Sequence, residues 1–148
     1  MSASSGISVA PDAVSTYNDL KSKKAWKYII FSLNKTLSEI SVVDKFAIKA
    51  ENKLDETGYY DKLLEALPEN ECRWAVYDLE FDTGEGKRNK LIFFSWAPDT
   101  AGVRQKMVSA SSKDALRRTL DGIGAEVQGT DPSEVAYETI LEKVTKRR

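Results

Sequence analysis

The stretch 96–120, WAPDTAGVRQKMVSASSKDALRRTL, decides how the rest of the chain is organised. Pro98 and Asp99 are typical of a helix entrance, because an aspartate at that place accepts hydrogen bonds from first-turn amides and favours the positive end of the helix dipole. Beyond them only Gly102 opposes a helix. The stretch therefore predicts one long helix from Asp99 to Leu120.

This helix would have two different faces when its residues are placed about 100 degrees apart. Leu116 and Leu120 share one side with Ser109 and Ser112, and because the leucines are the bulkiest apolar groups, that side should face the core. The opposite side carries Val103, Met107, Ala110, Asp114, Arg117 and Arg118, flanked by Lys106.

Two interpretations of that opposite side remain open from periodicity. Met107 and Ala110 lie between cations, a combination that suits a protein partner: alanine allows close approach, methionine adapts to irregular surfaces, and arginine makes forked bonds to carboxylates. Alternatively, Val103 and Met107 are buried and the helix kinks at Ser111 and Ser112.

Composition limits the function classes. The chain has 148 residues, 41% hydrophobic and 30% charged, with a formal net charge of -1, which fits one globular domain without a global attraction to nucleic acid. It shows neither a membrane-spanning run nor a signal peptide, so we expect a cytosolic protein. With one cysteine and no histidine, internal disulfides, the usual zinc sites and Ser-His-Asp triads are excluded.

The remaining pattern predicts an α/β fold with a central mixed β-sheet sandwiched by α-helices. Residues 1–10 are expected to be a mobile arm and residues 11–148 a single domain. Besides the long helix, we expect helices over 11–22 and 59–67 and one capped by Thr130, and strands over 26–33, 37–50, 73–81, 91–96 and 125–128.

Two connections stand out. Residues 45–57 form a polar loop or hairpin tip to which no function can be assigned. Residues 82–90 form a long hairpin connection that places Lys87, Arg88 and Lys90 at an exposed tip. Such a tip either solubilises the protein or docks on an acidic partner or on phosphates. The carboxylates of Asp78, Glu80 and Asp82 alternate along the preceding strand and look like an ordinary polar face.

Several motifs closely resemble the actin-depolymerising-factor (ADF/cofilin) family, and its fungal members most. They are FFSWAPDT at 93–100, KMVSASSKDALRR at 106–118 and VQGTD at 127–131, and LPEN at 67–70 and EGKR at 85–88 fit as well. The resemblance runs from Ser5 over nearly the whole chain. It implies the ADF homology fold and a protein that binds actin without catalysing a reaction, with no metal and no cofactor.

The resemblance also implies two actin-binding surfaces. The surface for monomers and filaments combines the N-terminal arm with the long helix, and it matches Ser4, Ser5, Gly6, Ile7, Arg104, Lys106, Met107, Lys113, Asp114, Arg117 and Arg118. The surface used only in filaments combines the hairpin tip with the last helix, and it matches Arg88, Lys90, Glu142, Lys143 and Lys146.

The resemblance further implies a monomeric protein of the cytoplasm and actin cytoskeleton. Such a protein prefers ADP-actin, severs and depolymerises filaments and drives actin turnover. Nuclear entry and filament-disassembly co-factors fit the same pattern. Ser5 is the candidate phosphorylation site, because added negative charge there would weaken an adjacent interface. Phosphoinositide head groups could compete with actin for the basic helix.

Two alternatives are kept: a phosphoinositide-binding module with secondary actin contact, and a branch-junction-binding relative of the glia maturation factor type. Arg88 and Lys90 argue against the second, which is expected to lack a basic hairpin tip. The chain departs from the family pattern in three places: Ser109 stands where relatives often have tyrosine, Gly102 replaces a frequent proline, and 45–57 is longer than in fungal relatives.

Overall fold

A computed structural model describes residues 7–49, 51 and 53–145 of the chain. No helix in these described parts is both long and apolar enough to cross a membrane. The elements, in chain order, are β1 (Ser8–Val9), α1 (Pro11–Lys23), β2 (Trp26–Leu33), β3 (Glu39–Ala47), α2 (Glu56–Ala66), β4 (Arg73–Asp82), β5 (Lys87–Trp96), α3 (Val103–Arg117), β6 (Ala125–Gly129), the 3₁₀ helix η2 (Pro132–Val135) and α4 (Tyr137–Thr145).

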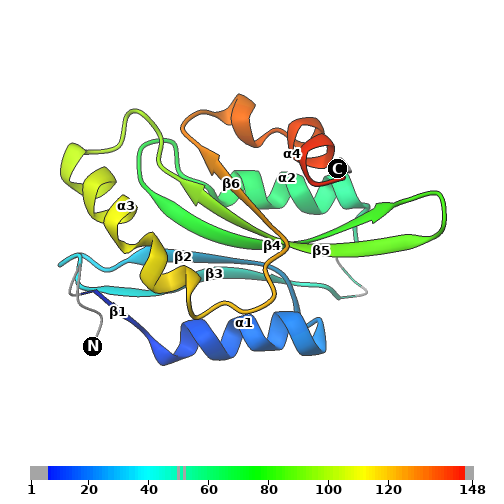
Figure 1. Cartoon of the computed structure of the whole chain (residues 1–148), viewed down its shortest axis with the longest axis horizontal. Coiled ribbons are helices and arrows are strands. Elements are labelled where there is room, and N and C mark those ends of the chain that lie inside the picture. Colours follow the sequence, from blue (N-terminus) through cyan, green and yellow to red (C-terminus); the bar gives the residue numbers. More distant parts are fainter. Residues whose placement is uncertain (1–6, 50, 52, 146–148) are drawn as a thin grey trace.

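The strands form one mixed sheet in the order β1-β3-β2-β4-β5-β6 (Figure 1). The inner pairs β3-β2, β2-β4 and β4-β5 are antiparallel, whereas the edge strands β1 and β6 pair in parallel with β3 and β5. The expected central mixed sheet is confirmed. β2 matches its predicted bounds because aromatic and branched apolar residues dominate it.

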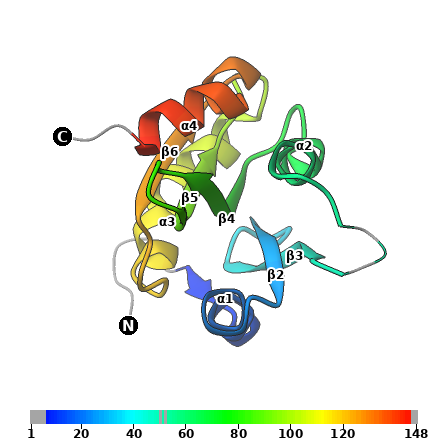
Figure 2. The same ribbon diagram turned by 90° about the vertical axis from the view of Figure 1, so that its right-hand side faces the viewer.

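Helices cover both faces of the sheet, with α1 and α3 on one side and α2 and α4 on the other (Figure 2). Strand alternation divides the core accordingly. Ile29, Phe31 and Val76 pack under α1 and α3, whereas Tyr28, Ile30 and other residues of the same strands pack under α2 and α4. The predicted sandwich of helices around the sheet is therefore confirmed.

The N-terminal boundary differs from the prediction. Residues 7–10 were expected in the mobile arm, but β1 pairs with β3, the Ala10 amide donates to the Ile40 carbonyl at 2.8 Å, and Ile7 is only 5% exposed. Apolar burial of Ile7 supplies the free energy that orders this short strand. Residues 1–6 lie outside the described residues.

The predicted long connection over 82–90 is wrong. β4 and β5 stay paired to Asp82 and Lys87, so the turn is only 83–86, with Gly84 and Gly86 at positive φ angles of 89° and 132°. Lys87, Arg88 and Lys90 therefore lie on a strand rather than in a loop. Their positions are fixed by the strand ladder.

The start of the long helix also differs. Asp99 does not cap it: α3 begins at Val103 after Gly102, with no side-chain cap. The reason is long-range, because the amides of Ala97 and Asp99 instead donate to the carbonyls of Gly129 and Thr130, at 3.0 and 3.3 Å. The segment before α3 thus continues the pairing between β5 and β6.

Two other helix starts moved. α2 begins at Glu56, three residues earlier than predicted, because Asp55 Oδ1 accepts a hydrogen bond from the Gly58 amide at 2.8 Å. Thr130 does not cap the last helix; Asp131 caps the short η2, and α4 begins only at Tyr137. Side-chain capping by aspartate thus decides where α2 and η2 begin.

The burial of α3 generates a stability prediction. Leu116→Ala should lower the free energy of unfolding by about 2–5 kcal/mol, because Leu116 is fully buried and its truncation leaves a cavity. Met107→Ala is the matched control on the same helix, and at 66% exposure it should change stability by no more than about 0.5 kcal/mol. Urea unfolding of both variants measures the difference, and equal losses would contradict the burial assigned to the two faces.

Candidate functional site

The outer face of α3 is the most unusual surface of the molecule. The helix is continuous from Val103 to Arg117, so the kinked alternative is wrong, and Ser109, Ser112 and Leu116 are buried as predicted. On the opposite side Val103 is 71% and Met107 66% exposed. One exposed line runs along the helix at spacings of three and four residues, and we call it the α3 stripe: Val103, Met107, Ala110, Asp114 and Arg118.

The inner face holds this stripe in place. Leu116 and Leu120 are completely buried in the cluster shared with α1 and the sheet. The turn after α3 is tied to α1, because the Tyr17 hydroxyl and the Lys21 ammonium both donate to the Asp121 carbonyl. Before the helix, Thr100 Oγ1 donates to the Glu69 carbonyl at 3.0 Å. The stripe is therefore presented by a helix fixed at both ends.

The cations around the stripe are of two kinds. Arg104 and Arg118 are exposed and form no ion pair within the described parts of the chain. Lys106 is half-buried, and its ammonium donates to the Asp99 carbonyl at 3.2 Å. Arg104 and Arg118 are thus available to a partner's carboxylates without first breaking an internal contact.

Arg117 departs from its predicted place on the outer face. Its Nε lies 2.6 Å from Glu126 Oε2 on the edge strand β6, and Lys113 Nζ lies 3.6 Å from the other oxygen of the same carboxylate. The hydrogen bond from Arg117 lowers the pKa of the Glu126 carboxyl below its ordinary value of 4.5. We call Lys113, Arg117 and Glu126 the paired flank of α3.

The second predicted surface lies at the other end of the molecule, where the β4-β5 hairpin passes beneath α4 (Figure 1). Arg88, Glu142 and Lys143 are exposed there. Lys90 is different: its stem lies against Gly124, and its ammonium donates to the Val144 carbonyl near the end of α4 at 2.9 Å. We call Arg88, Lys90, Glu142 and Lys143 the hairpin-α4 surface, in which Lys90 joins the two elements. Lys146 lies outside the described residues.

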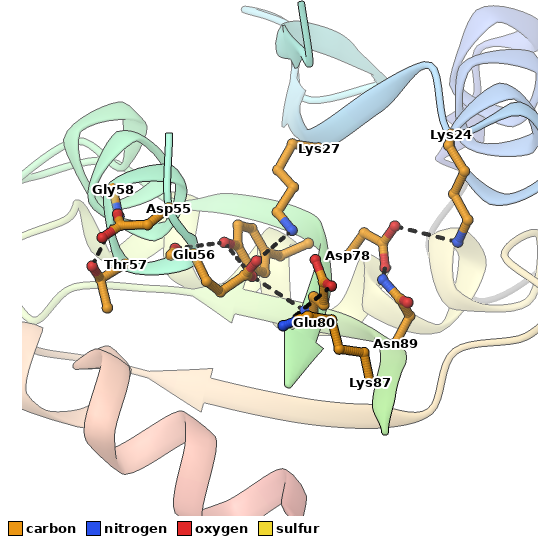
Figure 3. Close-up of polar contacts among 11 residues, drawn as sticks. Lys24, Lys27, Asp55, Glu56, Thr57, Gly58, Asp78, Glu80, Lys87 and Asn89 are labelled. Carbon is orange, nitrogen blue, oxygen red and sulfur yellow. Dashed lines mark hydrogen bonds and ion pairs between the residues drawn. The ribbon is translucent and has the colours of Figure 1, made fainter. Parts of the chain in front are cut away.

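A buried polar network lies at the root of the same hairpin (Figure 3). Lys27, only 3% exposed, places its ammonium 2.8 Å from Glu56 Oε1 and over the rings of Tyr59 and Tyr77, at 5.2 and 5.1 Å from their centroids. The Tyr77 hydroxyl donates to Glu56 Oε2 at 2.8 Å. A buried cation is tolerated here because it has both a carboxylate and two aromatic faces.

Asp78 does not belong to an ordinary polar face, as the alternation predicted. It is 4% exposed, accepts a hydrogen bond from Asn89 Nδ2 at 3.1 Å, and lies 3.4 Å from Lys24 Nζ. Glu80 and Asp82, in contrast, have partly exposed side chains. Their carboxylate oxygens lie 3.9 and 3.7 Å from Lys87 Nζ across the hairpin. The strand therefore has one buried carboxylate and two at the surface.

No group of His, Cys, Asp and Glu side chains in the described parts of the chain is arranged to hold a metal ion. Burial raises the pKa of the Cys72 thiol, which disfavours the reactive thiolate. The carboxylates of the hairpin root are engaged in ion pairs and hydrogen bonds.

Comparison with known proteins agrees with this arrangement. The model of the family described as "Cofilin/tropomyosin-type actin-binding protein" matches residues 6–145. This chain belongs to the cofilin family. The cofilin of Kluyveromyces lactis is 52% identical over 144 residues, covering 96% of this chain and 94% of the relative, and that of Ogataea parapolymorpha is 54% identical with the same coverage. A crystal structure of Streptomyces griseoflavus cofilin is 52% identical with a TM-score of 0.83, and the match covers 95% of this chain and 98% of that one.

Of the four N-terminal residues predicted to contact actin, the structure describes only Ile7. Ser4, Ser5 and Gly6 lie outside the described residues. Ile7 is buried beside Leu116 and the sheet, so its side chain is a core residue and the prediction that it contacts a partner is wrong for that side chain. The strand that follows Ile7, β1, contacts α3, the helix that carries the stripe.

Ser109 borders an open pocket of about 280 Å³ that is also lined by Cys72, Trp74 and Gln105. The expectation of a less filled core under α3 stays a prediction. The helix is still fixed there, because Gln105 Oε1 accepts a hydrogen bond from the Cys72 amide.

Sequence reasoning missed Glu126 and Glu56. Glu126 lies on the short edge strand β6, whose position beside α3 is set by its pairing with β5. Glu56 lies in the polar segment 45–57. Neither residue forms a local motif with its partners. The sequence offers one signal for them: basic residues such as Lys27 and Arg117, which would be expected to pair with a carboxylate if they were buried.

The paired flank generates a pH prediction. Glu126→Gln should lower the free energy of unfolding at pH 7 by about 0.2–1 kcal/mol, as for solvent-exposed ion pairs. Because the pKa of Glu126 is lowered on folding, this difference is present above pH 4.5 and is lost as the pH falls through the lowered pKa. Urea unfolding at a series of pH values measures it. Glu65→Gln is the control, since Glu65 pairs with Lys62 at 3.8 Å away from β6. A Glu126 effect that persists at low pH would contradict the pairing.

Proposed function

We propose that this protein binds monomeric and filamentous actin, severs and depolymerises filaments, and so drives actin turnover. The observation that carries the proposal is the α3 stripe in a chain of the cofilin family: Val103 and Met107 are 71% and 66% exposed on the face that also carries Arg104 and Arg118, which form no ion pair in the described parts of the chain. Large apolar side chains exposed together on a fixed helix mark an interaction surface. Cations beside them suit a partner that offers an apolar cleft rimmed by carboxylates.

In this proposal the stripe contacts actin directly and the paired flank shapes its edge. Met107 fills the cleft, Ala110 allows close approach of the two backbones, and Arg104 and Arg118 make new ion pairs. Lys106, Lys113 and Arg117 are held by internal acceptors, so they contribute positive potential at the rim. Asp114 supplies the one carboxylate of the stripe.

The hairpin-α4 surface would bind the neighbouring subunit of a filament. Because the two surfaces lie at opposite ends of one rigid domain, a single molecule can contact two actin subunits at once (Figure 1). Binding then favours the filament geometry that fits both contacts, and the population shifts towards it. Strain between decorated and bare segments would promote severing.

The proposal includes a preference for ADP-actin and a location in the cytoplasm at the actin cytoskeleton. Phosphorylation at Ser5 would add about 1.5–2 negative charges to the proposed monomer surface and weaken binding. Filament-disassembly co-factors are further partners in this scheme. In this proposal residues 11–148 form a single ADF homology domain, and β1 adds an edge strand to its sheet.

The apolar centre of the stripe favours a protein partner over the phosphoinositide alternative. A head group would use the cations and leave Val103 and Met107 in water, whereas Lys113 and Arg117 are already paired with Glu126. Liposome flotation at physiological salt separates the two, since purely electrostatic lipid binding fades with screening. The exposed Arg88 favours filament binding over the glia maturation factor type.

The α3 stripe generates a binding prediction. Met107→Ala combined with Arg118→Ala should weaken binding to actin monomers and to filaments by at least about tenfold, as expected when central interface residues are truncated. Fluorescence titration of actin monomers and pelleting with filaments measure this. Lys23→Ala, which removes an exposed pair with Asp19 on α1, is the control. Unchanged binding by the double variant would refute the assignment of the stripe.

The hairpin-α4 surface generates a separate prediction. Arg88→Ala combined with Lys143→Ala should weaken filament binding and leave monomer binding unchanged, because both side chains are exposed and far from α3. Lys90 is left intact, since it holds α4 through the Val144 carbonyl. The same two assays apply, with single-filament microscopy to count severing events. An equal loss of monomer binding would rule out two separate surfaces.

A further inference from the structure

The hairpin that carries Arg88 extends beyond the sheet, and this raises the question of what fixes its direction. β2 pairs with β4 only from Tyr28 to Phe31, opposite Tyr77 to Trp74. β4 continues to Asp82, paired on its other side with β5. Past Tyr77 the hairpin is therefore a two-stranded ribbon, and such ribbons are only marginally stable without further support.

The carboxylate of Glu56 occupies the place that a continuing β2 would fill. Its Oε2 accepts a hydrogen bond from the backbone amide of Glu80 at 3.2 Å, on the edge of β4 that β2 has left (Figure 3). The same oxygen accepts from the Tyr77 hydroxyl at 2.8 Å. A side chain from the first turn of α2 thus satisfies an edge amide that would otherwise be unpaired.

Lys27 fixes that carboxylate. The residue is the extra one at a bulge, because Trp26 and Tyr28 pair with the adjacent residues Ala47 and Phe46. A bulge re-aims a side chain, and here the Lys27 ammonium lies 2.8 Å from Glu56 Oε1 with its side chain 4% exposed. Burial and the neighbouring Glu56 charge raise the pKa of Tyr77, so its hydroxyl remains a donor.

The second strand of the ribbon is held at the same level. Buried Asp78 accepts from Asn89 Nδ2 at 3.1 Å and lies 3.4 Å from Lys24 after α1. Asn89 is paired with Glu80, and Arg88 is paired with the next residue, Phe81. Arg88 therefore lies one register position beyond the two anchors, and any change at the anchors reaches it directly.

We propose that Glu56, held by Lys27 and Tyr77, is a positioning residue for the hairpin-α4 surface: it fixes the direction of the hairpin and hence the place of Arg88 relative to Glu142 and Lys143. This inference rests on the proposed function of that surface. Glu56 itself touches no actin in this scheme. Its effect should therefore appear in filament binding and be absent from monomer binding.

The test uses Lys27→Met combined with Glu56→Leu in the full chain, which removes both buried charges together and leaves no lone ion. The matched control, Lys62→Met with Glu65→Leu, makes the same changes at an exposed pair on α2. Filament affinity should fall about 2- to 30-fold, the range for substitutions that act on a binding surface from outside it. Monomer affinity should stay unchanged, and the control should match the unsubstituted protein in both assays.

Amide hydrogen exchange by NMR reads the anchor directly. In the double variant the Glu80 amide should exchange at least about tenfold faster, as expected for loss of a hydrogen bond to a charged acceptor, whereas the Val76 amide within the sheet should keep its protection. Tyr77→Phe, which retains the ring and loses one donor to Glu56, should change both readouts in the same direction by a smaller factor. It replaces the double variant if that protein does not fold.

Three results would overturn the inference: a Glu80 amide that remains protected, a filament affinity equal to that of the control, or an equal loss of monomer affinity. Arg88→Ala separates this failure from failure of the proposed function. If Arg88→Ala weakens filament binding and the Glu56 variants do not, only the positioning role falls. If Arg88→Ala has no effect on filaments, the filament surface and the positioning role fall together.

Discussion

Both faces of the central strands are buried, and the rest of the molecule depends on that constraint. Tyr28 and Ile30 face one side of the sheet and Ile29 and Phe31 the other, so two layers of helices are required to cover them. Each helix packs one face against the sheet, and its opposite face remains at the surface. In α3 the remaining face is apolar at its centre, and because the inner face is fixed, a partner meets a preorganised surface and little conformational entropy is lost on binding.

The basic side chains of this protein fall into two groups, those bonded to internal acceptors and those without an ion pair in the described parts. Lys27, Lys90 and Arg117 are engaged with internal acceptors and hold elements together. Arg104 and Arg118 remain free of ion pairs in the described parts, and they lie where the proposed contacts form. Since the formal net charge is only -1, attraction to an acidic partner must come from these local groups and falls off within about 8–10 Å at physiological salt. Surface charge therefore gives orientation and specificity more than general affinity.

The sequence predicted what local patterns determine. The largely apolar stretch of β2 indicates a strand buried on both faces, and helix periodicity predicts the burial of Leu116. Partners that are distant in sequence could not be predicted. Asp99 is a good cap by local rules, but its amide is used by the pairing of the preceding segment with Thr130. Arg117 and Arg118 are neighbours on a helix, and only the position of β6 decides which of them meets Glu126. The groups that anchor the hairpin come from α2, β2, β4 and β5 and from Lys24 after α1, and they leave no pattern along the chain.

The edge strand β1 has a consequence for how the two parts of the proposed monomer surface cooperate. It contacts α3 and pairs with β3, so the arm is tethered at Ile7 directly beside the helix (Figure 1). A fully extended chain spans at most about 3.3–3.6 Å per residue, so chain length alone limits how far from Ile7 a contact by Ser4 or Ser5 could lie. Under the proposed function, such a contact and the contact of the α3 stripe would be linked within one chain. The second contact would then form at a raised effective concentration once the first has formed.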